Sequence, residues 1–501
     1  MNKSPHLSNG TFDAVPKDPS YHSNPQDQPR IHEIGARHPG RCGDKAAASF
    51  KDPSGFVFFY EGRILRQINP SYKDNYELLM QSGLYKRLID RGLMIPHGEA
   101  DLSLGEAGAY KVIEPLCLPF ISYPYEWCFS QLKDAALVTL AIQKEALACG
   151  MSLKDASSFN IQYYEGRPVF IDTLSFEKYE EGRPWVAYKQ FCEHFLAPLA
   201  LFACADARLG KLSQLDVDGV PLDLAVRLLP LRSLVKPSLF IHLFLHSRSQ
   251  KRYSDSALQP AEKTSFSRNS LQGLIDSLES AVNSLKWQTD KTVWTEYYAE
   301  DGNCLSYEHD ALSAKKNLVA AYLDKAGVKN LWDIGANAGM FSRVAAGKGI
   351  FVVSADNDPT VVEANYLQVK KDKEKNILPL LIDLVNPTPA VGWHNRERDA
   401  FISRALPDTV LALALIHHLA IGKNLPFSKI AEFFAELAEN LIIEFVPKED
   451  KQTQLLLRSR QDIFSEYDLG HFESEFGTFF NISARSAIPG SDRYLYLMTK
   501  K

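Results

Sequence analysis

The stretch Leu331-Trp-Asp-Ile-Gly-Ala-Asn-Ala-Gly-Met-Phe-Ser342 decides the fold of the C-terminal part of the chain. A short apolar run passes through Asp333, glycines follow at Gly335 and Gly339, and the residues after them have the composition of a helix. This succession is typical of the nucleotide-binding turn of parallel α/β sheets, where Gly335 permits the tight turn and Gly339 a close approach of the helix. The stretch therefore predicts a Rossmann-like sheet.

The spacing within this turn also indicates which ligand it binds. A dinucleotide fingerprint has the form G-x-G-x-x-G, but Asn337 and Met340 occupy its second and third glycine positions. Because a pyrophosphate needs bare backbone close by, these side chains disfavour NAD. S-adenosylmethionine (SAM) has no phosphate, and the Asp-x-Gly-x-x-x-Gly form of the turn suits it better.

Two further apolar runs each end in an acid. Ile350–Ala355 is followed by Asp356, about 20 residues beyond Gly335, where an acid can accept hydrogen bonds from both ribose hydroxyls. Leu378–Ile382 is followed by Asp383, which would face the adenine amino group. Since ligands of open α/β sheets bind at the carboxyl ends of the strands, both acids are candidate cofactor ligands.

A fourth strand-like run leads into His417 and His418, and a fifth, Leu441–Phe445, carries Glu444. Either histidine could act as a general base, because imidazole titrates near neutrality. Methyl transfer, however, often needs only the alignment and desolvation of a nucleophile against a sulfonium. A structural or pocket-lining role for the two histidines is therefore the preferred interpretation, and a catalytic role is the alternative.

The acids have structural alternatives as well. Asp356 could simply cap a helix, and Asp383 could be an ordinary loop acid. Asp358, which is followed by Pro359, is itself predicted to cap the next helix. The succession of glycine turn, two acids and the histidine pair along alternating strands and helices favours the ligand-binding interpretation.

With these elements in register, residues 331–445 resemble the class I SAM-dependent methyltransferases. Within that class the chain is most similar to the nodulation protein NoeA-like methyltransferases, through Asp383–Trp393, Ala412–Leu419 and Glu444–Asp450. The resemblance covers roughly residues 290–501. It implies a SAM-binding set made up of Asp333, Gly335, Asn337, Gly339, Asp356 and Asp383.

Residues 50–250 predict a second, α+β domain. Gly55–Ile68 reads as two strands joined at Glu61-Gly62, Tyr76–Ile89 has the apolar spacing of a helix, and residues 159–177 read as two short strands. Residues 154–177 resemble the catalytic loop of the protein-kinase-like and aminoglycoside-phosphotransferase-like fold. That resemblance implies Asp155 as a base, and Asn160 and Asp172 as magnesium ligands for Mg-ATP.

This part of the chain departs from an active phosphotransferase in several ways. Lys154 directly precedes Asp155 without a His-Arg pair, and no G-x-G-x-x-G phosphate loop is present. The phosphate-pairing lysine is missing, and only Arg63 or Arg66 could replace it. The sequence therefore predicts a kinase-like or substrate-recruiting domain with weak or absent phosphoryl transfer. The alternative is that these polar residues only cap a turn and end a strand.

Composition sets the broader class. The chain has 501 residues, a net charge of −5 and seven scattered cysteines without a C-x-x-C pair, so no basic field for nucleic acid and no zinc or disulfide framework is expected. No signal peptide or membrane-spanning stretch is evident, which favours a cytoplasmic protein. Residues 1–48 are predicted to be a disordered tail, 251–290 a linker and helix, and 291–501 the methyltransferase domain.

The sequence therefore predicts an α/β Rossmann-like methyltransferase domain joined to an α+β, kinase-like N-terminal domain, in two separable halves. The predicted activity is methyl transfer from SAM to an oxygen or nitrogen of a small-molecule or saccharide acceptor, with a protein acceptor as an alternative. A phosphotransferase with a regulatory SAM-binding domain is the second hypothesis, and a scaffold of two degenerate domains is the third. Four aromatic residues are candidates for roofing the acceptor pocket: Trp294, Tyr297, Tyr298 and Tyr307.

Overall fold

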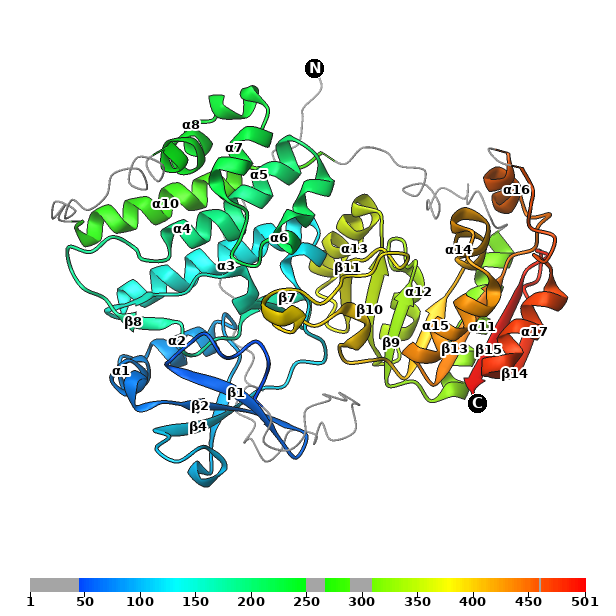
Figure 1. Ribbon diagram of the computed structural model, residues 1–501, viewed down its shortest axis with the longest axis horizontal. Helices are drawn as coiled ribbons and strands as arrows, with labels where there is room; N and C mark the ends of the chain where they lie inside the picture. Colours follow the sequence, from blue (N-terminus) through cyan, green and yellow to red (C-terminus); the bar gives the residue numbers. More distant parts are fainter. Residues whose placement is uncertain (1–44, 249–265, 289–308, 459–460) are drawn as a thin grey trace, which may run out of the picture.

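The computed structural model describes residues 45–248, 266–288, 309–458 and 461–501, which form two domains side by side (Figure 1). The predictions for the tail up to residue 44, for most of the linker after residue 248 and for the aromatic residues at 294–307 lie outside these residues. Within the 1–48 segment that the sequence predicts to be disordered, Lys45 forms an isolated β-bridge with Phe58. The end of the predicted tail is therefore wrong by a few residues.

The C-terminal domain is built on a seven-stranded sheet with the order β11-β10-β9-β12-β13-β15-β14. The first five strands are parallel, and β15 is antiparallel to both of its neighbours. Their order, 3-2-1-4-5, is that of doubly wound sheets, which confirms the Rossmann-like fold. The strands are β9 (Asn330–Ile334), β10 (Phe351–Asp356), β11 (Ile377–Leu381), β12 (Thr409–Ala412), β13 (Asn440–Phe445), β14 (Phe480–Ala487) and β15 (Tyr494–Lys500).

Helices bury both faces of this sheet. Leu331 and Leu411 pack with α11 and α12 on one face, and Trp332 and Val410 belong to the core on the other, with α13, α14, α15 and α17. Burial on both sides explains why the parallel strands read as nearly continuous apolar runs rather than alternating ones. The helices are α11 (His309–Ala326), α12 (Met340–Ala346), α13 (Pro359–Asp372), α14 (Ile416–Lys423), α15 (Phe427–Leu437), α16 (Lys451–Leu457) and α17 (Leu469–Phe479).

The N-terminal domain begins with a four-stranded antiparallel sheet in the order β1-β2-β4-β3. Glu61 and Gly62 join the first two strands as predicted, with φ of 48° and 75°, the left-handed conformations that a two-residue hairpin turn requires. The whole connection is this tight turn, so no long loop projects from it. The strands are β1 (Gly55–Tyr60), β2 (Arg63–Ile68), β3 (His97–Ala100) and β4 (Lys111–Pro115).

The single helix predicted over 76–89 is wrong in one respect. The chain forms two helices, α1 (Lys73–Gln81) and α2 (Leu84–Asp90), which are separated at Gly83. Gly83 has a φ of 76°, a left-handed conformation that ends one helix and redirects the chain before the next. The apolar spacing continues through both helices because each buries one side against the same core.

A largely helical lobe follows around the buried helix α3 (Phe129–Ala148). Its two hairpins pair β5 (Met151–Leu153) with β8 (Phe176–Lys178), and β6 (Ile161–Tyr164) with β7 (Arg167–Phe170). A small antiparallel sheet before a helical lobe with these hairpins is the predicted α+β, kinase-like architecture. The other α-helices of the lobe are α4 (Tyr188–Phe191), α5 (Ala197–Cys204), α6 (Leu212–Leu215), α7 (Leu222–Leu228), α8 (Pro237–Leu239) and α10 (Arg268–Ser284), which packs against α3.

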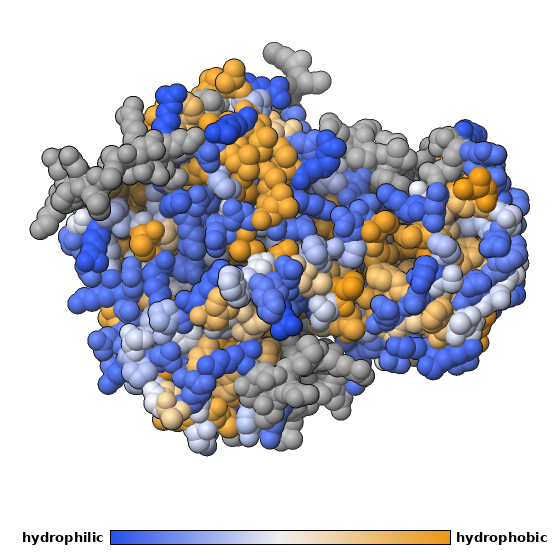
Figure 2. Space-filling view, in the orientation of Figure 1, coloured by the Kyte–Doolittle hydropathy of each residue, from blue (hydrophilic) through white to orange (hydrophobic). Residues whose placement is uncertain are grey.

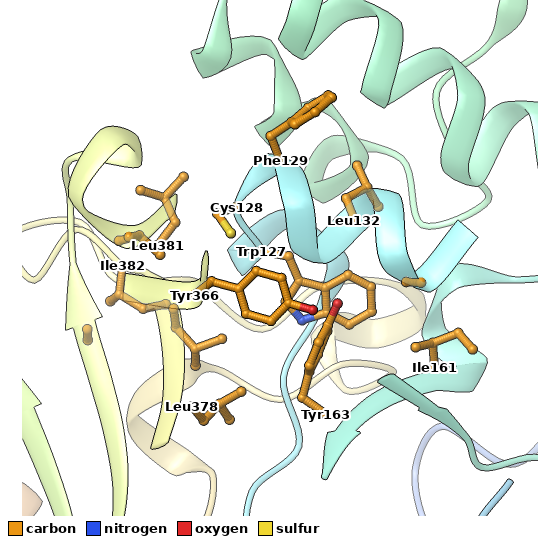
Figure 3. Packing of buried hydrophobic residues seen from close by; sticks show 14 of the residues in the cluster. Trp127, Cys128, Phe129, Leu132, Ile161, Tyr163, Tyr366, Leu378, Leu381 and Ile382 are labelled. Atoms are coloured by element: carbon orange, nitrogen blue, oxygen red, sulfur yellow. The ribbon is translucent and has the colours of Figure 1, made fainter. Parts of the chain in front are cut away.

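The two domains share one continuous apolar core. Trp127 and Tyr163 of the N-terminal domain face Tyr366 of α13 and Leu378 of β11 (Figure 3), and the rings of Tyr163 and Tyr366 meet edge to face at 5.7 Å between centroids. The sequence suggested two compact apolar regions that could be separated. The structure instead shows apolar side chains of both domains packed into each other.

Buried polar contacts reinforce this junction. Glu126 and Arg404 lie on opposite domains, form an ion pair of 2.5 Å, and have side chains only 0% and 4% exposed. Ser130, at the start of α3, donates both its amide and its hydroxyl to the carboxylate of Glu363 on α13. These groups satisfy one another only while the domains stay together, so the junction is a fixed part of the fold.

None of the described helices combines the length and the apolar character that crossing a bilayer requires.

Candidate functional site

The glycine turn after β9 has the backbone conformation that its sequence predicts. Gly335 and Gly339 have φ of 76° and 79°, in the left-handed region that side chains rarely adopt. A Cβ at Gly339 would lie 2.5 Å from Oδ1 of Asn365, so the glycine also makes room for α13. Asn337 has a φ of 51°, which asparagine tolerates better than most residues and which here replaces a glycine.

Asp356, the last residue of β10, lies against this turn. Its Oδ2 accepts a hydrogen bond of 2.8 Å from the Asn337 amide, and its Oδ1 accepts one of 3.0 Å from the Asp358 amide. Burial raises the pKa of the Asp356 carboxyl, while these backbone amides oppose the shift. Asp358 does cap α13, since its Oδ1 accepts from the Thr360 amide. Asp356 itself caps no helix in the described part of the chain, and a carboxylate oxygen that already accepts one hydrogen bond can accept another from a ligand.

Asp383 lies just beyond the end of β11, the strand next to β10. The Ile382 amide donates to the Asp356 carbonyl oxygen at 2.8 Å, which fixes Asp383 one residue beyond that contact. The Asp383 carboxylate accepts from the Val385 amide at 3.0 Å, and the residue is partly exposed. Asp383 therefore supports its own loop and also lies beside the Asp356 end of the sheet, so both of its predicted roles remain compatible with its position.

Asp333 lies deeper than the other predicted site residues. Its side chain is buried, and its Oδ2 accepts a hydrogen bond of 2.6 Å from the Ser342 hydroxyl at the start of α12. Burial raises the pKa of the Asp333 carboxyl to about 7. The visible role of Asp333 is to tie β9 to the helix after the turn, which holds Gly335 and Gly339 in place.

His417 and His418 lie at the beginning of α14, directly after β12, with their ring centroids 4.1 Å apart. His417 is completely buried, and among the described residues neither of its ring nitrogens has a hydrogen-bond partner. Burial lowers the pKa of His418 to about 4 and lowers that of His417 as well. Both imidazoles are therefore neutral and only weakly basic at pH 7, and this low basicity suits a hydrogen-bonding role better than proton abstraction.

A buried charge network borders the histidines, and the sequence did not reveal it. Lys315 of α11 pairs with Glu444 at 2.6 Å, and Arg493 joins Glu444 to Asp450. Glu444 also accepts a hydrogen bond of 2.8 Å from the amide of Ala414, whose φ of 49° is strained for a residue with a side chain. The one available signal was a glutamate inside an apolar strand, since a buried carboxylate needs cationic partners.

The kinase-like part brings Asp155, Asn160 and Asp172 close together, as their resemblance implies. Asp172, however, pairs with Arg66 of β2 at 2.5 Å, with both side chains largely buried. Asp172 also accepts from the Leu174 amide and the Ser175 hydroxyl. A guanidinium thus stands against the carboxylate where the resemblance implies magnesium, and of the two candidate arginines only Arg66 reaches it. Arg63 pairs with Glu114 instead.

Asp155 is equally engaged within the protein. Its Oδ1 accepts hydrogen bonds from the Ser157 amide and from the Gln190 side chain. Burial raises the pKa of Asp155, and the negative charge of Asp172 adds to this shift. Across the described ranges no cluster of three or more metal-ligating His, Cys, Asp or Glu side chains occurs. The residues present do not fit Mg-ATP, and that prediction is not supported.

Comparison with known proteins gives a relative along nearly the whole chain. The chain is 35% identical over 469 residues to "Nodulation protein NoeA" of Rhizobium meliloti (strain 1021), which covers 92% of this chain and 96% of that protein. No protein-family model matches the chain. An alignment of this length includes both domains.

Solved structures give weaker likenesses. Magnesium protoporphyrin IX methyltransferase of Synechocystis PCC 6803, with bound SAH, is 17% identical, covers 41% of this chain and 91% of its own, and has a TM-score of 0.30. The N-methyltransferase NodS of Bradyrhizobium japonicum WM9 is 12% identical, covers 38% and 97%, and has a TM-score of 0.28. The bifunctional kinase-methyltransferase WbdD is 14% identical, covers 38% and 39%, and has a TM-score of 0.27. Scores this low carry no weight, and the fold rests on the strand order itself.

Proposed function

The chain belongs to the family of the nodulation protein NoeA, and from that premise we propose that it transfers the methyl group of SAM to an oxygen or nitrogen of a small-molecule or saccharide acceptor. The C-terminal domain, a class I SAM-dependent methyltransferase domain by its strand order and glycine turn, would perform the transfer. The kinase-like domain would support that domain and would not transfer phosphate.

One observation carries the proposal. The carboxylate of Asp356 accepts the amide of Asn337, in the middle of the glycine turn, at 2.8 Å. This bond joins an acid at the end of one strand to the turn at the end of its neighbour, which is the arrangement that an adenosine ribose and its attached chain require. In contrast to Asp172, no cation pairs with Asp356 within the described residues.

The residues that would hold SAM follow from this arrangement. Asp356 would accept the ribose hydroxyls, Asp383 would face the adenine, and the backbone of Gly335, Asn337 and Gly339 would line the methionine side. When bound, SAM supplies a methyl group on a sulfonium, which is electrophilic without further activation. The chain itself then has to orient the acceptor and exclude water.

The acceptor would approach from the end of β12. His417 and His418 lie there. His417 is buried, whereas His418 is partly exposed, so the neutral imidazole of His418 would be the one to accept a hydrogen bond from an acceptor hydroxyl or amine. The carboxylate of Glu444 accepts the amide of the strained Ala414, a contact that would orient this strand end before any ligand arrives. A site with neutral imidazoles suits an uncharged polar nucleophile such as a sugar hydroxyl.

The second hypothesis, a phosphotransferase regulated by SAM, is not favoured. Phosphoryl transfer depends on groups that hold the phosphates from two sides. Acidic residues bind the metal ion on one side, and a loop covers the phosphates on the other. Arg66 already neutralises Asp172, and the strands that should carry the loop are joined by two residues only. Neither the free metal-binding acid nor the covering loop is therefore present in the described domain.

The proposal is tested by calorimetric titration of the full chain with SAM and, on the same preparation, with Mg-ATP. We expect a saturable heat of binding with SAM and none with Mg-ATP. Transfer of labelled methyl groups from SAM to a panel of saccharides and small hydroxyl or amino compounds then identifies the acceptor class. SAM binding without transfer to any acceptor class, protein included, would contradict the proposed activity, and Mg-ATP binding would favour the second hypothesis.

A further inference from the structure

One surface of the helical lobe carries apolar side chains where a globular domain normally hides them. Leu231 and Val235, at the two ends of the 3-10 turn η9 (Leu231–Val235), are 84% and 81% exposed. Further exposed apolar side chains lie on α7 and on the π-helical turn η10 (Phe240–Leu245): Leu224, Leu228, Phe240, Ile241 and Leu245. Figure 2 shows apolar side chains gathered over the part of this lobe where α7 and α8 lie.

These seven residues form one surface, here called the α7–η10 patch. The turn η10 packs against both α7 and η9, so the three elements lie side by side. Each element also has an inner side: Ala225 of α7 and Leu243 of η10 are buried in the core of the lobe. The exposed residues are therefore the outer side of folded elements, and packing within the described domain does not require them. Exposed apolar side chains gathered on neighbouring elements in this way mark an interaction surface.

The segment that carries most of the patch has charged residues of one sign. From Leu224 to Arg248 the sequence contains no aspartate or glutamate and four cationic residues, Arg227, Arg232, Lys236 and Arg248. The nearest acid along the sequence is Asp223, which lies at the first turn of α7 and pairs with Arg227 at 3.7 Å. The chain as a whole has a net charge of −5, so this basic segment differs from the remainder of the sequence.

We propose that the α7–η10 patch docks on an anionic lipid surface. Exposed leucine, isoleucine and phenylalanine side chains enter the boundary between headgroups and acyl chains, and the surrounding arginines and lysine contact the lipid phosphates. A second copy of this chain is a poorer occupant, because a two-fold contact would place the same cations against each other. An acidic protein partner is the remaining occupant, and the experiment below distinguishes it.

The test is flotation of the full chain with vesicles of phosphatidylcholine alone and with vesicles that contain about 30 mol% phosphatidylglycerol. We expect the protein to float with the anionic vesicles and to remain behind with the neutral ones. Added salt should weaken the binding, since the phosphate contacts are screened. Absence of binding to the anionic vesicles, or equal binding to both kinds, would overturn the proposal.

Two variants and a matched control locate the binding to the patch. The L231S/V235S variant should bind anionic vesicles about tenfold more weakly, because both side chains leave water on docking. The R227Q/R232Q variant should bind more weakly and lose part of the salt dependence. The control L367S/I482S replaces two exposed apolar residues of the other domain and should bind like the wild type. Equal losses in variant and control would overturn the proposal, as would a wild-type dimer that L231S/V235S converts to monomers.

Discussion

The two domains contain acid clusters of the same general kind, and they differ in what holds the acids. At the end of β10, Asp356 accepts hydrogen bonds from the backbone amides of Asn337, in the glycine turn, and of Asp358. In the kinase-like lobe, Asp172 pairs with the guanidinium of Arg66, and Asp155 accepts from Gln190. The first acid is oriented by neutral donors, and the second is neutralised by a cation.

Under the proposed function, this difference separates acids that are free to bind a ligand from acids that only hold the fold together. Backbone amides fix a carboxylate without cancelling its charge, so that it can still attract a ligand. A buried arginine neutralises the charge of the carboxylate and occupies its hydrogen-bonding oxygens. Removing the arginine would leave the buried acid unpaired. The useful criterion is therefore the partner of the acid and not the acid itself.

The comparison assumes that the two domains fold as one cooperative unit. The largest expected effect, on the free energy of unfolding, tests this assumption. Replacing Glu126 by Gln leaves Arg404 buried without its counter-charge, so we expect the free energy of unfolding to fall by about 3–5 kcal/mol. Urea unfolding followed by fluorescence measures it. K86A, which removes an exposed ion pair on α2, is the matched control and should change little. Two separate transitions in the wild type, one per domain, would show that the domains fold independently.

The next expected effect contrasts the two acids directly. D356A should bind SAM at least about tenfold more weakly, because a charge-assisted hydrogen bond contributes roughly 1.5–3 kcal/mol. D172A should leave SAM affinity unchanged, since Asp172 lies in the N-terminal domain and pairs there with Arg66. Calorimetric titration of both variants gives the comparison, and circular dichroism confirms that each is folded. Unchanged affinity in a folded D356A would remove Asp356 from the site.

Much of the C-terminal site could be predicted from the sequence because it is local. The glycine turn, Asp356 and Asp383 each follow an apolar run, and in a parallel sheet the carboxyl ends of such runs lie at one edge. The hairpin at Glu61-Gly62 is local in the same sense. Even the position of Asp358 as a helix cap follows from the proline after it.

The rest depends on contacts between residues far apart in the chain. Arg66 and Asp172 are brought together only when β2 packs on the helical lobe, and nothing near either residue indicates the pair. Lys315 and Glu444 meet in the same way across the sheet. The sequence does not predict the break between α1 and α2 at Gly83, because apolar spacing indicates only which side of a segment is buried. Two successive helices that pack on one core keep that spacing.

Acid should affect the N-terminal domain through its buried histidines. Burial lowers the pKa of His194 to about 4 from an unfolded value near 6.5, with the charge of Arg398 adding to the shift. The unfolded state then takes up the proton first, so the stability that neutral His194 contributes is complete above pH 6.5 and is lost as the pH falls toward 4. H194Q should reduce the slope of unfolding free energy against pH by about 1 kcal/mol per pH unit in that range. H471Q, at a half-exposed histidine of the other domain, is the control. An unchanged slope in H194Q would contradict the assignment.

The smallest expected effect concerns nucleotide binding in the kinase-like lobe. We expect no ATP turnover by the wild type, and therefore no change in D172A. The sharper variant is R66A, which releases Asp172 from its cation and restores the charge that a magnesium ion would need. We expect Mg-ATP to remain unbound even then, because the two-residue turn between β1 and β2 provides no backbone to cover the phosphates. Calorimetry with Mg-ATP on the wild type and R66A decides between the two causes. Binding by R66A alone would mean that the arginine by itself excludes the nucleotide. Turnover by the wild type that D172A abolishes would instead make the protein a bifunctional kinase and methyltransferase, and the comparison between the two acid clusters would fail.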